Sequence, residues 1–174
     1  MRPQLNSGTL GGRRMLSVLE QHLVYREMEL LSDADLVRWA RAIIREDDAA
    51  SSDPDILELS ALRLDSPGLG DALRLLRAAV TRASPNFDIR GPGAQAFGRA
   101  AFVQTCRRFL AENLPPYQLC RLVSPIEQTF DYPAWLGDFY NQCDWCEPDS
   151  TRSQFGHLAE YVAQFIAENA DLPS

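Results

Sequence analysis

The sequence contains no lysine, only two histidines and no long apolar run, and these absences narrow the classes of protein to which it can belong. All 17 of its basic residues are arginine, which the base composition of the source genome explains without any specific use of arginine geometry. The formal net charge is −7. Because binding to phosphates needs a basic surface, this charge argues against nucleic acid as the main partner and is compatible with a basic protein partner.

Membrane and secretion signals are also missing. No apolar run approaches the roughly 20 residues of a membrane span. Residues 1–15 carry arginine but no apolar core behind it, so they do not form a signal peptide. Four cysteines in 174 residues do not make a disulfide scaffold. We therefore predict no membrane association and a cytoplasmic location with reduced thiols.

The sequence has none of the common catalytic motifs. We find no GxxxxGK[ST], GxGxxG, HExxH or GxSxG pattern. The prediction is a protein that is not an enzyme, with no catalytic residues and no cofactor.

Apolar residues recur at helical spacing along nearly the whole chain, and no segment alternates as a strand does. This pattern predicts helices over 15–31, 32–46, 54–62, 69–80, 94–113, 116–130 and 133–146, and a last helix that begins after Thr151 or Ser153. Pro125 predicts a kink or a restart within the helix 116–130. We predict an all-α fold: a single compact domain, 14–170, of about seven or eight helices with mostly antiparallel neighbours. Flexible tails, 1–13 and 171–174, are predicted at its ends.

The stretch 114–147 is predicted to be the centre of this domain, because it holds two of the three tryptophans and three of the four cysteines. The predicted inward face of its second helix comprises Trp135, Leu136, Phe139, Tyr140 and Cys143. The longest irregular connection is predicted at 84–93, which makes that loop a candidate for function.

Cys143 and Cys146 form a CxxC motif that has several interpretations. A redox dithiol needs its first cysteine at a helix N-terminus, whereas this motif is predicted to close a helix. A zinc site or a thiol nucleophile could combine Cys143 and Cys146 with His157, but the sequence supplies neither a complete ligand set nor a third catalytic group. The favoured interpretation is that the cysteines are small buried hydrophobic residues. The metal-binding or thiol-enzyme interpretation remains the alternative.

Acidic residues cluster around the same motif. They are Asp138, Asp144, Glu147 and Asp149, with Trp145 among them. Such a cluster is either solvated surface or a negative patch that attracts a basic partner. Tryptophan is enriched at binding hot spots, although core packing explains Trp145 equally well. We therefore predict these five residues as the partner-binding site.

Four segments resemble a group of small bacterial helical proteins. They are LSDADLVRWARAIIRED, DPDILELSAL, PPYQLCRLVSPIEQTF and PAWLGDFYNQCDWCE, and the resemblance as a whole covers about residues 32–167. Some members of that group look like immunity proteins of polymorphic-toxin or contact-dependent inhibition systems. The resemblance implies a protein that binds and blocks a basic toxin domain encoded nearby. The other alternative is a helical adaptor or structural subunit, with a possible homodimer formed through the predicted helix 15–31.

Overall fold

The computed structural model describes residues 16–46, 48, 50–65 and 67–172, and every regular element in these ranges is helical. The predicted all-α class is confirmed. No helix within the described ranges is long and apolar enough to cross a membrane. The predicted tail 1–13 lies outside the described residues, as do residues 173–174 of the predicted C-terminal tail.

The chain folds as two compact units, which we describe separately. Unit 1 comprises 1–24 and 33–97, and unit 2 comprises 25–32 and 98–174. The division falls inside helices α1 (Val18–Glu27) and α5 (Pro92–Ala111), so each of these helices contributes residues to both units.

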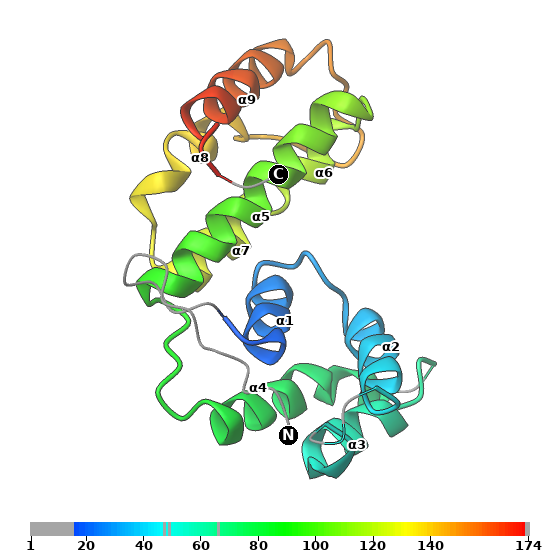
Figure 1. Cartoon of the computed structure of the whole chain (residues 1–174). Helices are drawn as coiled ribbons and strands as arrows, with labels where there is room; N and C mark the ends of the chain where they lie inside the picture. The colour runs from blue at the N-terminus through cyan, green and yellow to red at the C-terminus, as the bar shows by residue number, and fades with distance from the viewer. Residues whose placement is uncertain (1–15, 47, 49, 66, 173–174) are drawn as a thin grey trace. The chain divides into compact units, whose positions relative to one another are not determined.

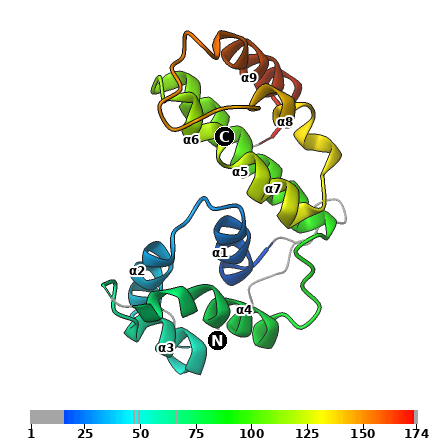
Figure 2. The same ribbon diagram turned by 180° about the vertical axis from the view of Figure 1, so that it is seen from behind.

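Unit 1 is built on α2 (Asp33–Ile43), α3 (Pro54–Ala61) and α4 (Ala72–Ala83), which pack on one another (Figures 1 and 2). Short 3-10 turns at Ala50–Ser52 and Pro67–Asp71 precede α3 and α4. The buried side chains of the three α-helices are Leu36, Val37, Ala40, Ile56, Leu59, Ala72, Leu75, Leu76, Ala79 and Val80. Their helical spacing in the sequence is what places them on the shared inner faces.

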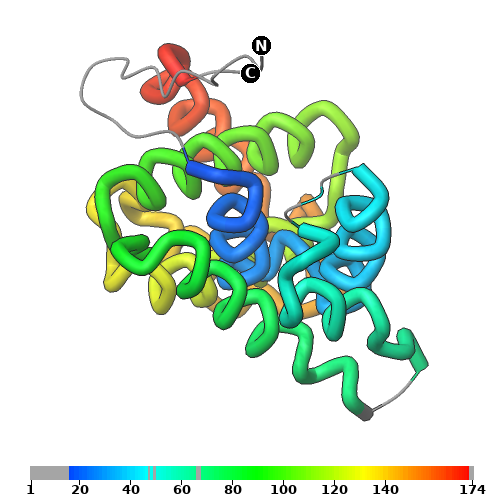
Figure 3. The backbone as a smooth tube through the Cα atoms, turned by 60° about the horizontal axis from the view of Figure 1, so that its bottom comes forward, coloured from blue at the N-terminus to red at the C-terminus, as the bar shows by residue number. Residues whose placement is uncertain are grey.

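Side-chain hydrogen bonds hold both ends of α3. Asp53 caps the N-terminus, where its carboxylate accepts from the backbone N–H groups of Asp55 and Ile56. Arg41 on α2 donates to the carbonyl oxygens of Ser60 and Leu62 at the other end, over 2.9 and 2.7 Å. These contacts satisfy groups that a helix terminus leaves unpaired. After α4, residues 84–91 lead into α5 (Figure 3).

Unit 2 combines residues 98–111 of α5 with α6 (Pro116–Cys120), α7 (Val123–Phe130), the 3-10 turn Ala134–Leu136, α8 (Phe139–Gln142) and α9 (Gly156–Glu168). An aromatic cluster forms its core. Phe139 makes edge-on contacts with Phe102, Phe165 and Tyr161, with ring centroids 4.9, 5.0 and 4.9 Å apart. Edge-to-face pairs of this kind add to the hydrophobic gain from burial.

The predicted helix 133–146 is wrong, because the chain is α-helical only over Phe139–Gln142 in this stretch. Gly137 has a φ of +62° and ends the preceding 3-10 turn. Leu136 and Phe139 are buried as predicted, but Tyr140 is 61% exposed instead of facing inward. The longest connection was predicted at 84–93, but the loop there spans only 84–91 and is shorter than the segment 143–155 between α8 and α9.

Replacing Gly98 by alanine is expected to lower the free energy of unfolding by about 1–3 kcal/mol. A Cβ at Gly98 would lie 2.5 Å from Cζ of the buried Phe130 and 3.1 Å from Sδ of Met28. Gly156→Ala is the matched control, because a Cβ at Gly156 meets nothing within 4 Å. Urea unfolding of both variants checks this. A Gly98→Ala protein as stable as Gly156→Ala would contradict the close packing at α5 and α7.

Candidate functional site

The five predicted site residues lie in unit 2, at both ends of α8 (Figure 1). Asp138 directly precedes the helix, and the other four residues lie in the loop that follows it. We call residues 138–149 the acidic segment. Asp138, Asp144, Glu147 and Asp149 are all exposed. No basic residue occurs between Arg121 and Arg152, and within the described residues no arginine pairs with Asp144, Glu147 or Asp149. The segment therefore presents uncompensated negative charge.

Asp138 differs from the other carboxylates because it holds the start of α8. Its carboxylate accepts hydrogen bonds from the side chains of Gln142 and Asn141, and these bonds hold its pKa below the usual range. Its backbone N–H donates to the hydroxyl oxygen of Tyr161 on α9, over 2.7 Å. The geometry gives Asp138 a local positioning role in addition to its charge.

A disulfide anchors the acidic segment. Cys143, directly after α8, is bonded to Cys120 at the end of α6, with the two Cα atoms 5.1 Å apart. The prediction that the cysteines are reduced, buried hydrophobic residues is wrong for this pair. It agrees with the structure for Cys106, which is completely buried and whose thiol pKa is raised by that burial.

Trp145 projects into solvent from this anchored turn. Its side chain is 84% exposed, and its φ of +62° lies in the left-handed region. A bulky residue rarely adopts that conformation, which costs on the order of 1–3 kcal/mol unless the surroundings impose it. The turn is closed by a hydrogen bond from the Cys146 N–H to the Cys143 carbonyl oxygen, over 3.2 Å. Core packing is thus wrong as an explanation of Trp145.

Two further exposed aromatic residues were missed by the sequence analysis. Tyr140 on α8 is 61% exposed, and Tyr132, which also has a positive φ, is 75% exposed. The sequence did contain a signal for Tyr132, because this residue lies between Asp131 and Pro133, where one predicted helix ends and the next begins. No signal distinguished Tyr140 from Phe139, since both fit the helical pattern.

The residues of the alternative site, Cys143, Cys146 and His157, are not arranged as a metal or nucleophile site. Cys143 is in the disulfide, and Nε2 of His157 lies 3.3 Å from the carbonyl oxygen of Gln142. Burial raises the pKa of the Cys146 thiol, and the charge of Glu147 raises it further, against a hydrogen bond with Ser150. Within the ranges that the structure describes, no three histidine, cysteine or acidic side chains come together as a metal site would require.

Basic side chains instead have structural roles in unit 2. Arg152 closes the C-terminus of α5 by donating to the carbonyl oxygens of Leu114 and Phe109, and its guanidinium lies 4.3 Å from the Phe109 ring centroid. Stacking on an aromatic face and bidentate donation are uses to which arginine is well suited. Arg152 thus fixes the far end of the loop that carries the acidic segment.

No protein-family model matches the chain, and neither a curated protein nor a solved structure matches it.

Proposed function

We propose that this chain is a protein-binding inhibitor of the immunity type, which covers the functional surface of a basic toxin domain encoded nearby and is not itself an enzyme. The acidic segment is the proposed contact surface. The proposal rests first on Trp145, whose large side chain is held in solvent by an unusual backbone conformation. An energetic cost imposed at an exposed tryptophan is more consistent with recognition than with folding.

Charge supports the same surface. Three exposed carboxylates, on Asp144, Glu147 and Asp149, lie within five residues of Trp145 and have no arginine partner among the described residues. Such charges raise the association rate with a basic partner and disfavour acidic ones. An apolar anchor surrounded by charge is also the usual arrangement of a binding hot spot and its rim.

Rigidity supports it as well. The disulfide to Cys120 and the contacts of Asp138 with Tyr161 fix the start of the segment, and Arg152 fixes its end. A surface that is ordered before binding loses less conformational entropy when the complex forms.

Affinity capture tests the proposal directly. The purified chain is immobilised and exposed to the products of the genes adjacent to its own, with and without reductant. Both conditions are needed because the proposed compartment is the cytoplasm, where disulfides are rare. The proposal predicts one stoichiometric complex with a basic neighbour. Failure to capture any neighbouring product in either condition would contradict it.

Reversing two charges in the acidic segment, Asp144→Arg with Glu147→Arg, is expected to weaken that complex at least tenfold, or about 1.4 kcal/mol. The loss should lie mainly in the association rate, and the salt dependence of binding should decrease because fewer attractive charges remain to be screened. Stopped-flow kinetics at several salt concentrations measures both effects.

The matched control is Glu46→Arg with Asp48→Arg, which makes the same change in net charge at exposed positions of unit 1. This control should retain most of the affinity. Equal losses in the two double variants would show that only net charge matters and would remove the acidic segment from the proposal.

A further inference from the structure

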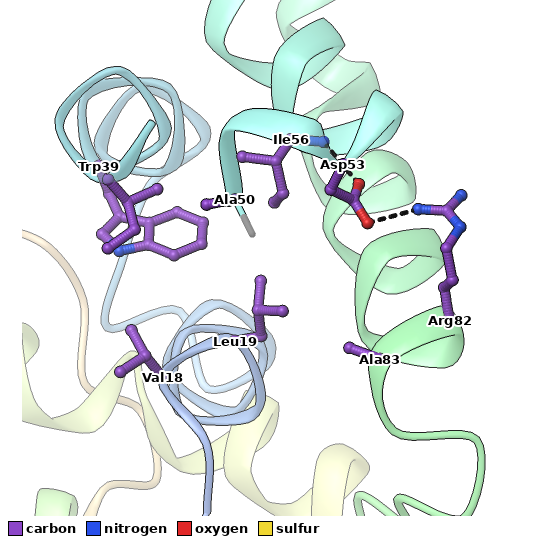
Figure 4. Close-up of a pocket in the computed structure, with 9 residues that line it drawn as sticks. Val18, Leu19, Trp39, Ala50, Asp53, Ile56, Arg82 and Ala83 are labelled. Atoms are coloured by element: carbon purple, nitrogen blue, oxygen red, sulfur yellow. Dashed lines mark hydrogen bonds and ion pairs between the residues drawn. The ribbon is translucent and has the colours of Figure 1, made fainter. Parts of the chain in front are cut away.

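A second candidate site lies in unit 1, on residues that the proposed function does not use. It is a cavity of about 300 Å³ (Figure 4). Its walls come from α1, α2, the start of α3 and the end of α4, and they include Leu19, Trp39, Ile43, Ile56 and Arg82. This volume is at the lower end of the range for small-molecule pockets.

Most of the lining is apolar and only partly removed from water. Ile56 is buried, Leu19, Trp39 and Ile43 are half-buried, and Val18 is 51% exposed. A ligand that fills the cavity would cover this apolar surface, which is a favourable change.

His22 packs against one face of the Trp39 ring and holds it in place. The two rings stack with centroids 4.2 Å apart, and Nδ1 of His22 lies 2.8 Å from the carbonyl oxygen of Val18. Burial lowers the pKa of His22, so the imidazole is neutral at neutral pH and adds no positive charge beside the cavity.

The other end of the cavity is polar, because Asp53 and Arg82 line it. Asp55 is not part of the lining but pairs with the same guanidinium, so the charges at this end do not cancel. Arg82 pairs with Asp53 over 2.6 Å and also with Asp55, so two carboxylates share one guanidinium. Burial alone would raise the pKa of Asp53, but hydrogen bonds from Arg82 and from two backbone amides lower it below its usual value. Asp53 is therefore ionised, and two carboxylates against one guanidinium leave the group with a net negative charge.

This excess of negative charge determines which polar group a ligand in the cavity can carry. An anionic ligand group would approach a cluster whose net charge is already negative, whereas an ammonium can approach the carboxylate oxygens and reduce that excess. Figure 4 shows Trp39 and the Asp53–Arg82 pair on opposite sides of the cavity, with apolar side chains between them.

We propose that this cavity binds a small amphipathic amine, with its apolar body against Trp39, Leu19 and Ile56 and its ammonium group at the Asp53–Asp55–Arg82 cluster. The site is independent of the proposed partner-binding function, since it uses unit 1 residues only.

Titration of the full chain with n-alkylamines from butylamine to octylamine tests the proposal, with ¹H–¹⁵N spectra as the readout. The indole resonance of Trp39 should shift, while those of Trp135 and Trp145 stay in place. Affinity should rise about fourfold for each added methylene until the cavity is filled. Octanoate should bind at least tenfold more weakly than octylamine. Equal binding of octanoate, or an unshifted Trp39 resonance in millimolar octylamine, would overturn the proposal.

Two variants, each with a matched control, locate the ligand. Ala83→Phe should fill the cavity and abolish binding, whereas Ala61→Phe, at an exposed position of α3 outside the lining, should not. Asp53→Asn keeps an N-cap acceptor but removes a charge, so the preference for amine over carboxylate should fall about tenfold. Asp48→Asn makes the same change in net charge away from the lining and should preserve the preference. The same selectivity in Asp53→Asn and Asp48→Asn would overturn the placement of the ammonium.

Discussion

Replacing Phe139 by alanine is expected to lower the free energy of unfolding by about 3–5 kcal/mol. The Phe139 side chain is completely buried and contacts the rings of Phe102, Tyr161 and Phe165. Its loss removes both the apolar burial and three edge-on ring contacts, and the rigid neighbours cannot fully close the space. Urea unfolding followed by circular dichroism measures the change.

Tyr140 is the matched control for Phe139. It is the next residue in α8, carries a ring of similar size and is 61% exposed. Tyr140→Ala should change the stability by no more than about 0.5 kcal/mol, as surface substitutions usually do. If Tyr140→Ala costs as much as Phe139→Ala, the orientation of α8 is incorrect.

Loss of the Cys120–Cys143 disulfide is expected to cost about 3 kcal/mol of stability. The two cysteines are 23 residues apart in sequence, and the bond restricts the unfolded chain over a loop of that length. The variant Cys120→Ala with Cys143→Ala should show this loss in urea, and adding reductant should cause no further change in it. Reductant should destabilise the unsubstituted chain by a similar amount.

Cys146→Ser is the matched control for the disulfide variant, because it removes a cysteine that is free in the structure. It should leave the effect of reductant intact. Thiol titration of the denatured, non-reduced chain should find two thiols, those of Cys106 and Cys146. Four titratable thiols in protein purified without reductant would contradict the pairing.

The sequence was sufficient to predict helix boundaries that depend only on neighbouring residues. The start of α3 follows from Asp53 and Pro54, a capping carboxylate followed by a proline that needs no hydrogen-bond donor in a first turn. The break before α7 was also expected near Pro125, although the helix begins at Val123 and no side chain caps it. Local signals of this kind are read correctly without tertiary information.

The prediction of a helix over 133–146 was wrong because the structure of this region depends on distant residues. Its apolar spacing fits a continuous helix, but the chain turns at Gly137 and leaves α8 at Cys143, which is bonded to Cys120. No helical periodicity encodes a bond between residues 23 positions apart. The partner-binding residues were named from composition alone, and only the structure distinguishes the exposed Trp145 from the half-buried Trp135.

The affinity of Trp145→Ala for the captured partner, measured by titration calorimetry, tests the central proposal most directly. If Trp145 is the apolar anchor of the acidic segment, the dissociation constant should rise at least thirtyfold, or about 2 kcal/mol, with folding stability unchanged. A dissociation constant within threefold of that of the unsubstituted chain would show that the partner binds elsewhere.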